Sequence, residues 1–140
     1  MQIEIATHAT DELVGAFARL LPQLSATSRA TAESIARAID SEDVTIFVAR
    51  HDHEIIGLAT LIAVPIPTKI RAIIEDVVVD TRVRGQGAGE ALVRAMIDHA
   101  RATGATAIEL TSHPDRAAAN RLYQRLGFAL RTTNPYRLVL

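Results

Sequence analysis

Cysteine is absent from this chain of 140 residues, and its absence excludes several kinds of chemistry. Without a thiol there can be no disulfide bond, no thiolate zinc site and no acyl-cysteine intermediate. Any group that this protein transfers must therefore move without a cysteine nucleophile. Aromatic residues are also scarce, at 4% of the sequence, so the core has to be built from aliphatic side chains.

Strong charge and long apolar runs are missing too. A formal net charge of −1 provides no general attraction to nucleic acid or to anionic membranes, and we expect neither as a partner. No stretch reaches the roughly 18 apolar residues of a membrane-spanning helix, and the N-terminal residues lack the pattern of a signal peptide. We therefore expect a cytoplasmic protein with a single domain over residues 1–140.

The most informative stretch runs from residue 73 to residue 103. It opens with a run rich in β-branched residues, which favours a buried strand. The segment Gly-Gln-Gly-Ala-Gly follows at residues 85–89, and apolar residues then recur at the three- and four-residue spacing of an amphipathic helix. A turn made mostly of glycine, which has no side chain, leaves the backbone N–H groups accessible. Between a strand and a helix, such a turn directs unpaired N–H groups and the positive end of the helix dipole at one point. An anion, most often a phosphate, is the natural occupant of such a turn.

These glycines have several explanations. The simplest is a turn that joins a strand to a helix and binds nothing, and three phosphate-binding motifs are the alternatives. A P-loop requires Gly-x-x-x-x-Gly-Lys-Ser/Thr, and no Lys-Ser/Thr pair follows. A dinucleotide fingerprint places its third glycine where Glu90 stands, although Glu109 lies about the right distance downstream for a ribose-binding acid. A third pattern, Arg/Gln-x-x-Gly-x-Gly/Ala, fits residues 84–89 without a gap. In this respect the segment resembles the pyrophosphate loop of the GNAT superfamily of N-acetyltransferases.

The order of expected elements points the same way. Periodicity and turn residues predict strands at 2–5, 44–49, 55–64, 70–79, 107–111, 128–131 and 136–140, and helices at 10–21, 28–39, 87–103 and 115–126. The strand–helix–strand unit implies parallel neighbours, and the hairpins imply antiparallel pairing. The fold class is therefore α/β, an α+β mixed sheet with the order β-α-α-β-β-β-α-β-α-β-β. This is also the element order of the GNAT fold.

A second motif extends the resemblance to nearly the whole chain. Residues 120–128, Asn-Arg-Leu-Tyr-Gln-Arg-Leu-Gly-Phe, resemble the GNAT signature of an asparagine, a tyrosine and a Gly-Phe pair around the penultimate helix. Residues 112–119 are similar to the loop that commonly leads into that helix. Two motifs in the correct order and spacing identify the chain as resembling a GNAT-type acyl-CoA N-acyltransferase.

The resemblance implies that acetyl-CoA, or a related acyl-CoA, is the co-substrate and that an amine is the acceptor. In the family, the pantetheine arm pairs with the backbone of the central strand, here Val77 and Val79, and Asn120 matches a position that hydrogen-bonds this arm. The pyrophosphate would lie over the glycine-rich loop, with an arginine at its rim. The implied loop contacts are Arg82, Arg84, Gly85, Gln86, Gly87, Ala88 and Gly89.

Two residues match the family's catalytic positions. Tyr123 carries over to the general acid that protonates the thiolate leaving group, although a tyrosine here could also be purely structural. Glu75 is the candidate general base for the amine, acting directly or through water, with a structural carboxylate as the alternative. Glu75 and Asp76 would face opposite sides of a regular strand, so only one of them should face the reacting groups. No metal is expected. His51 and His53 have a spacing that could bind a metal, but they lie in a polar turn with no further ligand nearby in the sequence.

The sequence leaves the acceptor open. A small-molecule amine, a protein amine and a non-catalytic acyl-CoA-binding module all remain, and Glu75 with Tyr123 favours the first two. The resemblance implies that the acceptor site is shaped by segments at roughly residues 20–34, 64–70 and 131–137. These segments contain few acids, which favours a small molecule. The apolar end Tyr136–Leu140 predicts an unpaired edge strand and, with it, a possible homodimer.

Overall fold

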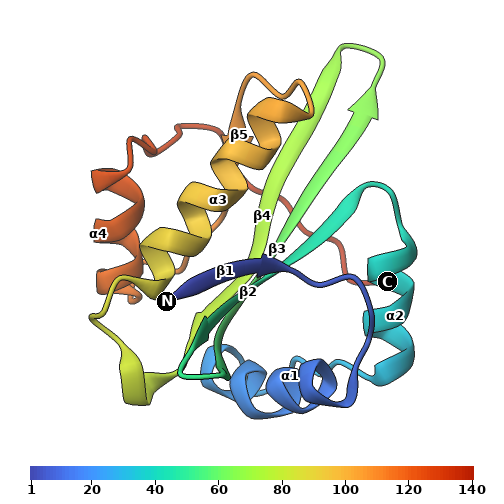
Figure 1. The fold of residues 1–140 in the computed structure, drawn as a ribbon. Coiled ribbons are helices and arrows are strands. Elements are labelled where there is room, and N and C mark those ends of the chain that lie inside the picture. The colour runs from blue at the N-terminus through green and yellow to red at the C-terminus, as the bar shows by residue number, and fades with distance from the viewer. The chain divides into compact units, whose positions relative to one another are not determined.

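A five-stranded mixed sheet forms most of the larger of two units in the computed structural model, which describes residues 1–140. The units are Met1–Leu110 and Thr111–Leu140, and each is described by itself. The larger unit contains β1 (Gln2–Ile5), α1 (Asp11–Leu24), α2 (Ala32–Asp40), β2 (Val44–His51), β3 (Glu54–Ile66), β4 (Lys69–Val79), the short 3₁₀ helix η1 (Thr81–Val83), α3 (Ala88–Ala102) and β5 (Ile108–Glu109) (Figure 1). The smaller unit contains α4 (Ala117–Arg125).

The strands lie in the order β1-β2-β3-β4-β5, and the mixed α/β class predicted from the sequence is confirmed. The first four strands pair antiparallel with their neighbours, while β4 and β5 are parallel and connected through α3. Pairing between β4 and β5 stops after two residue pairs, Ala72 with Ile108 and Ile73 with Glu109. From Ile74 onward, β4 therefore has a sheet neighbour on its β3 side alone.

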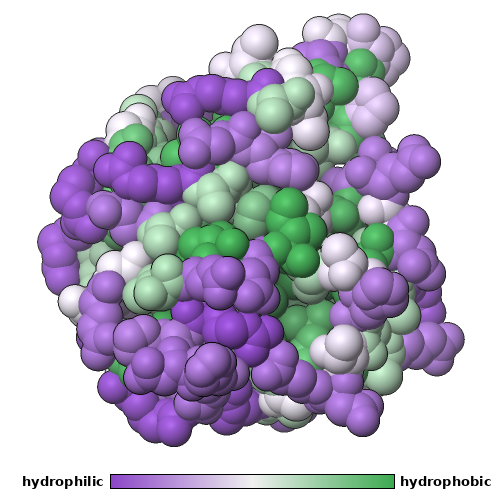
Figure 2. Space-filling model, in the orientation of Figure 1, coloured by the Kyte–Doolittle hydropathy of each residue, from purple (hydrophilic) through white to green (hydrophobic).

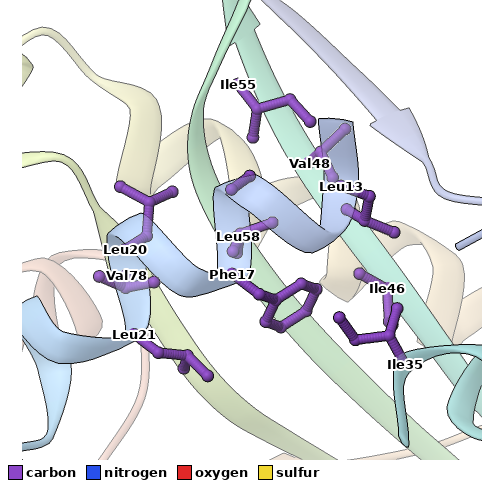
Figure 3. Close-up of a cluster of buried hydrophobic side chains, with 11 residues drawn as sticks. Leu13, Phe17, Leu20, Leu21, Ile35, Ile46, Val48, Ile55, Leu58 and Val78 are labelled. Atoms are coloured by element: carbon purple, nitrogen blue, oxygen red, sulfur yellow. The ribbon is translucent and has the colours of Figure 1, made fainter. Parts of the chain in front are cut away.

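The first core layer lies under α1 and α2. Thr10 caps α1 by accepting a hydrogen bond from the Leu13 N–H at 3.1 Å, and the apolar side of the helix then faces the sheet (Figure 3). Asp11 and Glu12 in the first turn of α1 are exposed, and the lower part of the surface in Figure 2 is largely hydrophilic. This layer contains Leu13, Ala16, Phe17, Leu20, Leu21, Ile35, Ile46, Val48, Ile55, Leu58 and Val78.

The second core layer lies under α3, on the opposite face of the sheet. Leu92, Val93 and Met96 are fully buried there. Gly57 in β3 permits the close approach of α3, since an added Cβ would stand 3.1 Å from Leu92 Cδ1 and 3.3 Å from Ala49 Cβ. The two layers are dominated by aliphatic side chains, as the low aromatic content predicted.

The smaller unit is organised by the end of α4. Gly127, with φ of 98°, terminates the helix, and its N–H donates to the Gln124 carbonyl at 3.1 Å. The Phe128 N–H reaches the Tyr123 carbonyl at 2.9 Å, and the two rings meet edge to face with 5.8 Å between centroids. This pattern of hydrogen bonds, with an apolar contact across it, is the Schellman motif. Gly127 and Phe128 therefore have a local structural role at the end of α4.

Two expected strands are wrong. Residues 128–131 and 136–140 form no strand in the structure, and the apolar edge strand that motivated the homodimer is therefore absent. β propensity alone does not form a strand, because an isolated pair of strands is marginally stable and Pro135 offers no N–H to a ladder. The large apolar side chains of this segment are exposed: Leu130, Tyr136, Leu138, Val139 and Leu140.

Candidate functional site

The glycine-rich loop leads directly into the N-terminus of α3. Gly85 and Gly87 have φ of 82° and 87°, a region that side-chain-bearing residues rarely adopt. Space around both glycines is open, so their conformation and not crowding calls for glycine. Gly87 is the N-cap of α3 and supplies no side-chain cap. The backbone N–H groups of residues 85–89 consequently have no partner inside the protein, and the helix dipole adds its positive end.

The two loop arginines differ in what they contact. Arg82 is engaged with acids: its Nη2 lies 2.7 Å from Asp80 Oδ2 and 3.0 Å from Glu54 Oε1. Arg84 donates from Nε to the Val79 carbonyl at 3.3 Å and has no acidic partner. Arg84 is thus the loop arginine whose positive charge is not neutralised within the protein.

The backbone of β4 beside the loop is open on one side. Val77 and Val79, the expected partners of the pantetheine arm, lie beyond the last residue that pairs with β5. Alternate N–H and C=O groups along this stretch face an edge that no strand of the sheet occupies. A strand-like ligand could add to that edge by backbone hydrogen bonds.

A β-bulge interrupts β4 next to the candidate base. Glu75 pairs with Thr60 and Val78 with Leu58, so three steps along β4 match two along β3. Asp76 occupies the extra position with φ of 53°. The expectation of a regular strand is wrong here, because the extra residue breaks the alternation of faces, and both carboxylates are exposed.

The pKa of Glu75 is shifted from its ordinary value, although the side chain is exposed to solvent. Partial burial of its carboxyl raises its pKa above the ordinary 4.5, and the neighbouring charge of Asp76 raises that pKa further. A carboxylate with a raised pKa is a stronger base toward an ammonium group than an ordinary glutamate. This property suits a general base without assigning that role.

The smaller unit contains the other two candidates. Tyr123 is the buried residue of α4, and burial raises the pKa of its phenol above 10.0, opposed by the charge of Arg116. Its hydroxyl has no hydrogen-bond partner in the protein and is not sealed from solvent. The Asn120 amide donates to the carbonyls of His113 and Arg116 at 2.9 and 2.8 Å, which leaves its carbonyl oxygen as the group that could accept from a ligand.

The structure therefore groups the predicted residues in two sets. Glu75, Val77, Val79 and the loop 82–89 follow one another within the larger unit, and Asn120 and Tyr123 share one helix of the smaller unit. Sequence reasoning missed Asp80, a buried carboxylate between β4 and the loop. The sequence did contain a sign of this residue, because an acid follows an apolar strand and stands two positions before an arginine with which it could pair.

Neither a metal site nor a membrane helix is found. No group of three or more histidine, cysteine, aspartate or glutamate side chains is arranged to hold a metal ion. His51 is the last residue of β2, and His53 lies in the exposed hairpin turn that follows. No helix has both the length and the apolar character that a membrane span needs.

Comparison with known proteins agrees with this geometry. The model of the acetyltransferase (GNAT) family matches residues 10–128, which include the bulged strand, the glycine-rich loop and the asparagine–tyrosine helix. The chain belongs to the GNAT acetyltransferase family. This membership supports acyltransferase activity in general, and the family uses acetyl-CoA as its co-substrate.

Solved structures share the GNAT fold over almost the whole chain. An acetyltransferase from Trypanosoma brucei is 26% identical with a TM-score of 0.81, and 99% of each chain is covered. An aminoglycoside acetyltransferase from an uncultured soil metagenomic sample, crystallised with sisomicin, is 20% identical with a TM-score of 0.84, covering 99% of this chain and 95% of that one. Glucosamine-6-phosphate N-acetyltransferase from Arabidopsis thaliana is 21% identical with a TM-score of 0.78, and 99% of each chain is covered. No curated protein sequence matches this GNAT chain significantly.

The loop gives a first testable prediction. Acetyl-CoA at 100 times its Kd should stabilise the wild-type protein by about 2.7 kcal/mol, seen as a rise in Tm. Gly87→Val should abolish this rise, because a β-branched residue cannot adopt φ of 87° without moving the loop. Gly89→Glu should abolish it by placing a carboxylate in the first turn of α3, beside the phosphates.

The matched control for these loop variants is Gly15→Ala. Gly15 lies inside α1 with open space around it, so this change leaves the loop intact. The control should keep the full acetyl-CoA-dependent rise in Tm. Unchanged affinity for acetyl-CoA in both loop variants would show that the cofactor binds elsewhere.

Proposed function

We propose that this protein is an N-acetyltransferase that moves the acetyl group of acetyl-CoA to the primary amine of a small molecule. The observation that carries the proposal is the loop 85–89, whose unpaired N–H groups meet the N-terminus of α3. The open edge of β4 beside it supports a site for the pantetheine arm, with Val77 and Val79 as its backbone partners. A pyrophosphate over the loop and an arm along β4 would place the thioester near the bulge at Asp76.

The proposed chemistry is direct attack in a ternary complex. The amine nitrogen attacks the thioester carbonyl carbon, the C–N bond forms and the C–S bond breaks. Glu75 accepts the proton that the amine loses, directly or through water, and Tyr123 donates a proton to the departing thiolate. Because the chain has no cysteine, an acyl-cysteine intermediate is excluded.

A small-molecule acceptor is favoured over a protein amine for two reasons. The fold neighbours include enzymes named for aminoglycoside and glucosamine 6-phosphate substrates, which are small amines. The acceptor-side loops expected from the sequence also contain few acids that would attract a basic peptide.

The test is an acceptor panel with acetyl-CoA, following release of free thiol. The panel should contain an aminoglycoside, an amino-sugar phosphate, a polyamine and a lysine-containing peptide, with a reaction lacking acceptor as the blank. Thiol release with one of the small amines supports the proposal. Turnover of the peptide alone would make this a protein acetyltransferase, and acetyl-CoA binding without turnover of any amine would indicate a binding module.

A homodimer is a separate proposal. The exposed apolar side chains of the C-terminal segment, Leu138, Val139 and Leu140 among them, could be covered by a second copy. Sedimentation should then give twice the mass of 15.1 kDa at assay concentrations. A single species of monomer mass would remove the proposal.

A further inference from the structure

Asp80 is the one charged residue that is buried in this protein, with 1% of its surface exposed. It follows the last residue of β4 and is the N-cap of η1, the short helix that leads into the glycine-rich loop. An isolated carboxylate at such a position would be costly, so its partners have to compensate for the lost hydration. Those partners come from two elements, η1 and α1.

The first set of partners belongs to η1. Asp80 Oδ1 accepts from the Arg82 backbone N–H at 3.0 Å, and Oδ2 accepts from the Arg82 side chain at 3.1 Å from Nε and 2.7 Å from Nη2. The same residue therefore binds the carboxylate through its backbone and through a two-pronged guanidinium contact. This geometry fixes both the path of the chain and the direction of the Arg82 side chain.

The second set of partners belongs to α1. Arg19 places Nη1 at 3.4 Å from Asp80 Oδ2, while its Nη2 donates to the Ile55 carbonyl at 2.9 Å. Gln23 Oε1 accepts from the Thr81 N–H, next to Asp80, at 2.8 Å. The start of the loop is therefore held to α1 and, through Arg19, to β3.

The charge of this carboxylate is permanent under assay conditions. The hydrogen bonds from Arg82 hold the pKa of Asp80 at about 2, below its ordinary 3.8, against the opposing effect of burial. Glu54 Oε1 accepts from Arg82 Nη2 at 3.0 Å, so this guanidinium faces two acids and has little positive charge left for a phosphate. Arg84, two residues later, has no acid beside it.

We propose that Asp80 is a positioning residue for acyl-CoA binding, which anchors the start of the glycine-rich loop on α1 and withholds Arg82 from the phosphates. This inference rests on the proposed function of the loop. A loop anchored before the ligand arrives loses less conformational freedom on binding, and this preorganisation appears as affinity for the cofactor. The neutralisation of Arg82 leaves Arg84 and the backbone N–H groups as the anion donors.

The decisive variants are Asp80→Asn and Arg82→Gln, compared with Arg50→Gln as the matched control. Arg50 is likewise paired with two acids, Glu4 at 3.3 Å and Glu12 at 2.9 Å, but it joins β2 to β1 and α1 and forms no ion pair with η1 or the glycine-rich loop. All three variants should lower the Tm. The first two alone should raise the Kd for CoA, measured by calorimetry, about tenfold or more.

Steady-state kinetics with an amine that the enzyme acetylates distinguishes a positioning role from a merely structural one, because a merely structural role would not change the KM for acetyl-CoA selectively. Asp80→Asn should raise the KM for acetyl-CoA while kcat and the KM for the acceptor stay within about twofold of wild type. If Asp80→Asn does not fold, Arg82→Gln gives the same test, because the Arg82 side chain is 62% exposed. A KM for acetyl-CoA equal to that of wild type in Arg82→Gln would overturn the proposal.

A double variant separates anchoring from direct phosphate contact. If Arg82 acts through Asp80, then Asp80→Asn combined with Arg82→Gln should weaken CoA binding no more than the stronger single change. Additive losses would mean that Arg82 contacts the phosphates itself and would overturn the proposal. Failure of the proposed function is a different result: the wild-type protein would then release no thiol with any amine, while CoA binding would still report on Asp80. A wild-type protein that binds no CoA would overturn both.

Discussion

Replacing Tyr123 by phenylalanine is expected to lower kcat by roughly 10²–10⁴-fold, the range typical of general acid catalysis, with little change in acetyl-CoA affinity. The substitution keeps the ring and its edge-to-face contact with Phe128, and it removes only the hydroxyl. Because that hydroxyl has no hydrogen-bond partner in the protein, its loss leaves no buried group unsatisfied. Steady-state kinetics and the Kd for CoA measure the two quantities.

The other tyrosine of the chain supplies the control. Tyr136 is 91% exposed, and Tyr136→Phe should leave kcat unchanged. The pH profile adds a second check, because burial raises the pKa of Tyr123 above 10.0 and keeps it protonated throughout the usual assay range. The wild-type rate should therefore show no alkaline decline below about pH 10 that belongs to this residue. Near-normal kcat in Tyr123→Phe would reject its role as the acid.

Replacing Glu75 by glutamine is expected to depress kcat by a comparable factor and to remove the limb of the pH profile that rises as the base ionises. The pKa of Glu75 is raised above 4.5, so activity that needs the carboxylate is lost as pH falls through a value above 4.5. The glutamine has the same shape and no ionisation. If the base acts through water, the limb should survive in part, because another group can accept the proton.

Asp76→Asn is the matched control for the base. The charge of Asp76 contributes to the raised pKa of Glu75, so its removal should move the acid limb toward lower pH without abolishing it. Deprotonation of the amine substrate also raises the rate with pH, so the profile has to be repeated with an acceptor of different pKa. A limb that follows the acceptor belongs to the substrate. If Tyr123→Phe and Glu75→Gln both retain kcat, the protein works by positioning its substrates and polarising the thioester.

Local sequence was enough to predict most elements of the larger unit. The glycine spacing of 85–89 requires backbone conformations that other residues rarely adopt, and the structure shows positive φ at Gly85 and Gly87. The apolar spacing after residue 88 predicted the buried side of α3, and Leu92, Val93 and Met96 lie there. These features depend on near neighbours in the chain, which is why a single sequence reveals them.

Features set by pairing between distant segments could not be predicted in this way. The bulge at Asp76 depends on how β3 and β4 align, so the regular strand expected from the sequence of β4 alone is wrong at this point. The strands expected at 128–131 and 136–140 failed for the same reason, because a strand needs a partner as well as propensity.

The sequence by itself determined the mixed α/β class, the exclusion of cysteine chemistry and the position of the glycine-rich loop. Only the tertiary structure decided how the two loop arginines differ. Asp80 brings Arg82 together with Arg19 from α1, whereas Arg84 has no acid beside it. The two arginines stand two positions apart in one short segment, and nothing in their local sequence separates them. The difference arises from the buried carboxylate of Asp80, which contacts Arg19 on α1, 61 residues away in the sequence. An ion pair forms according to distance in space and not along the chain.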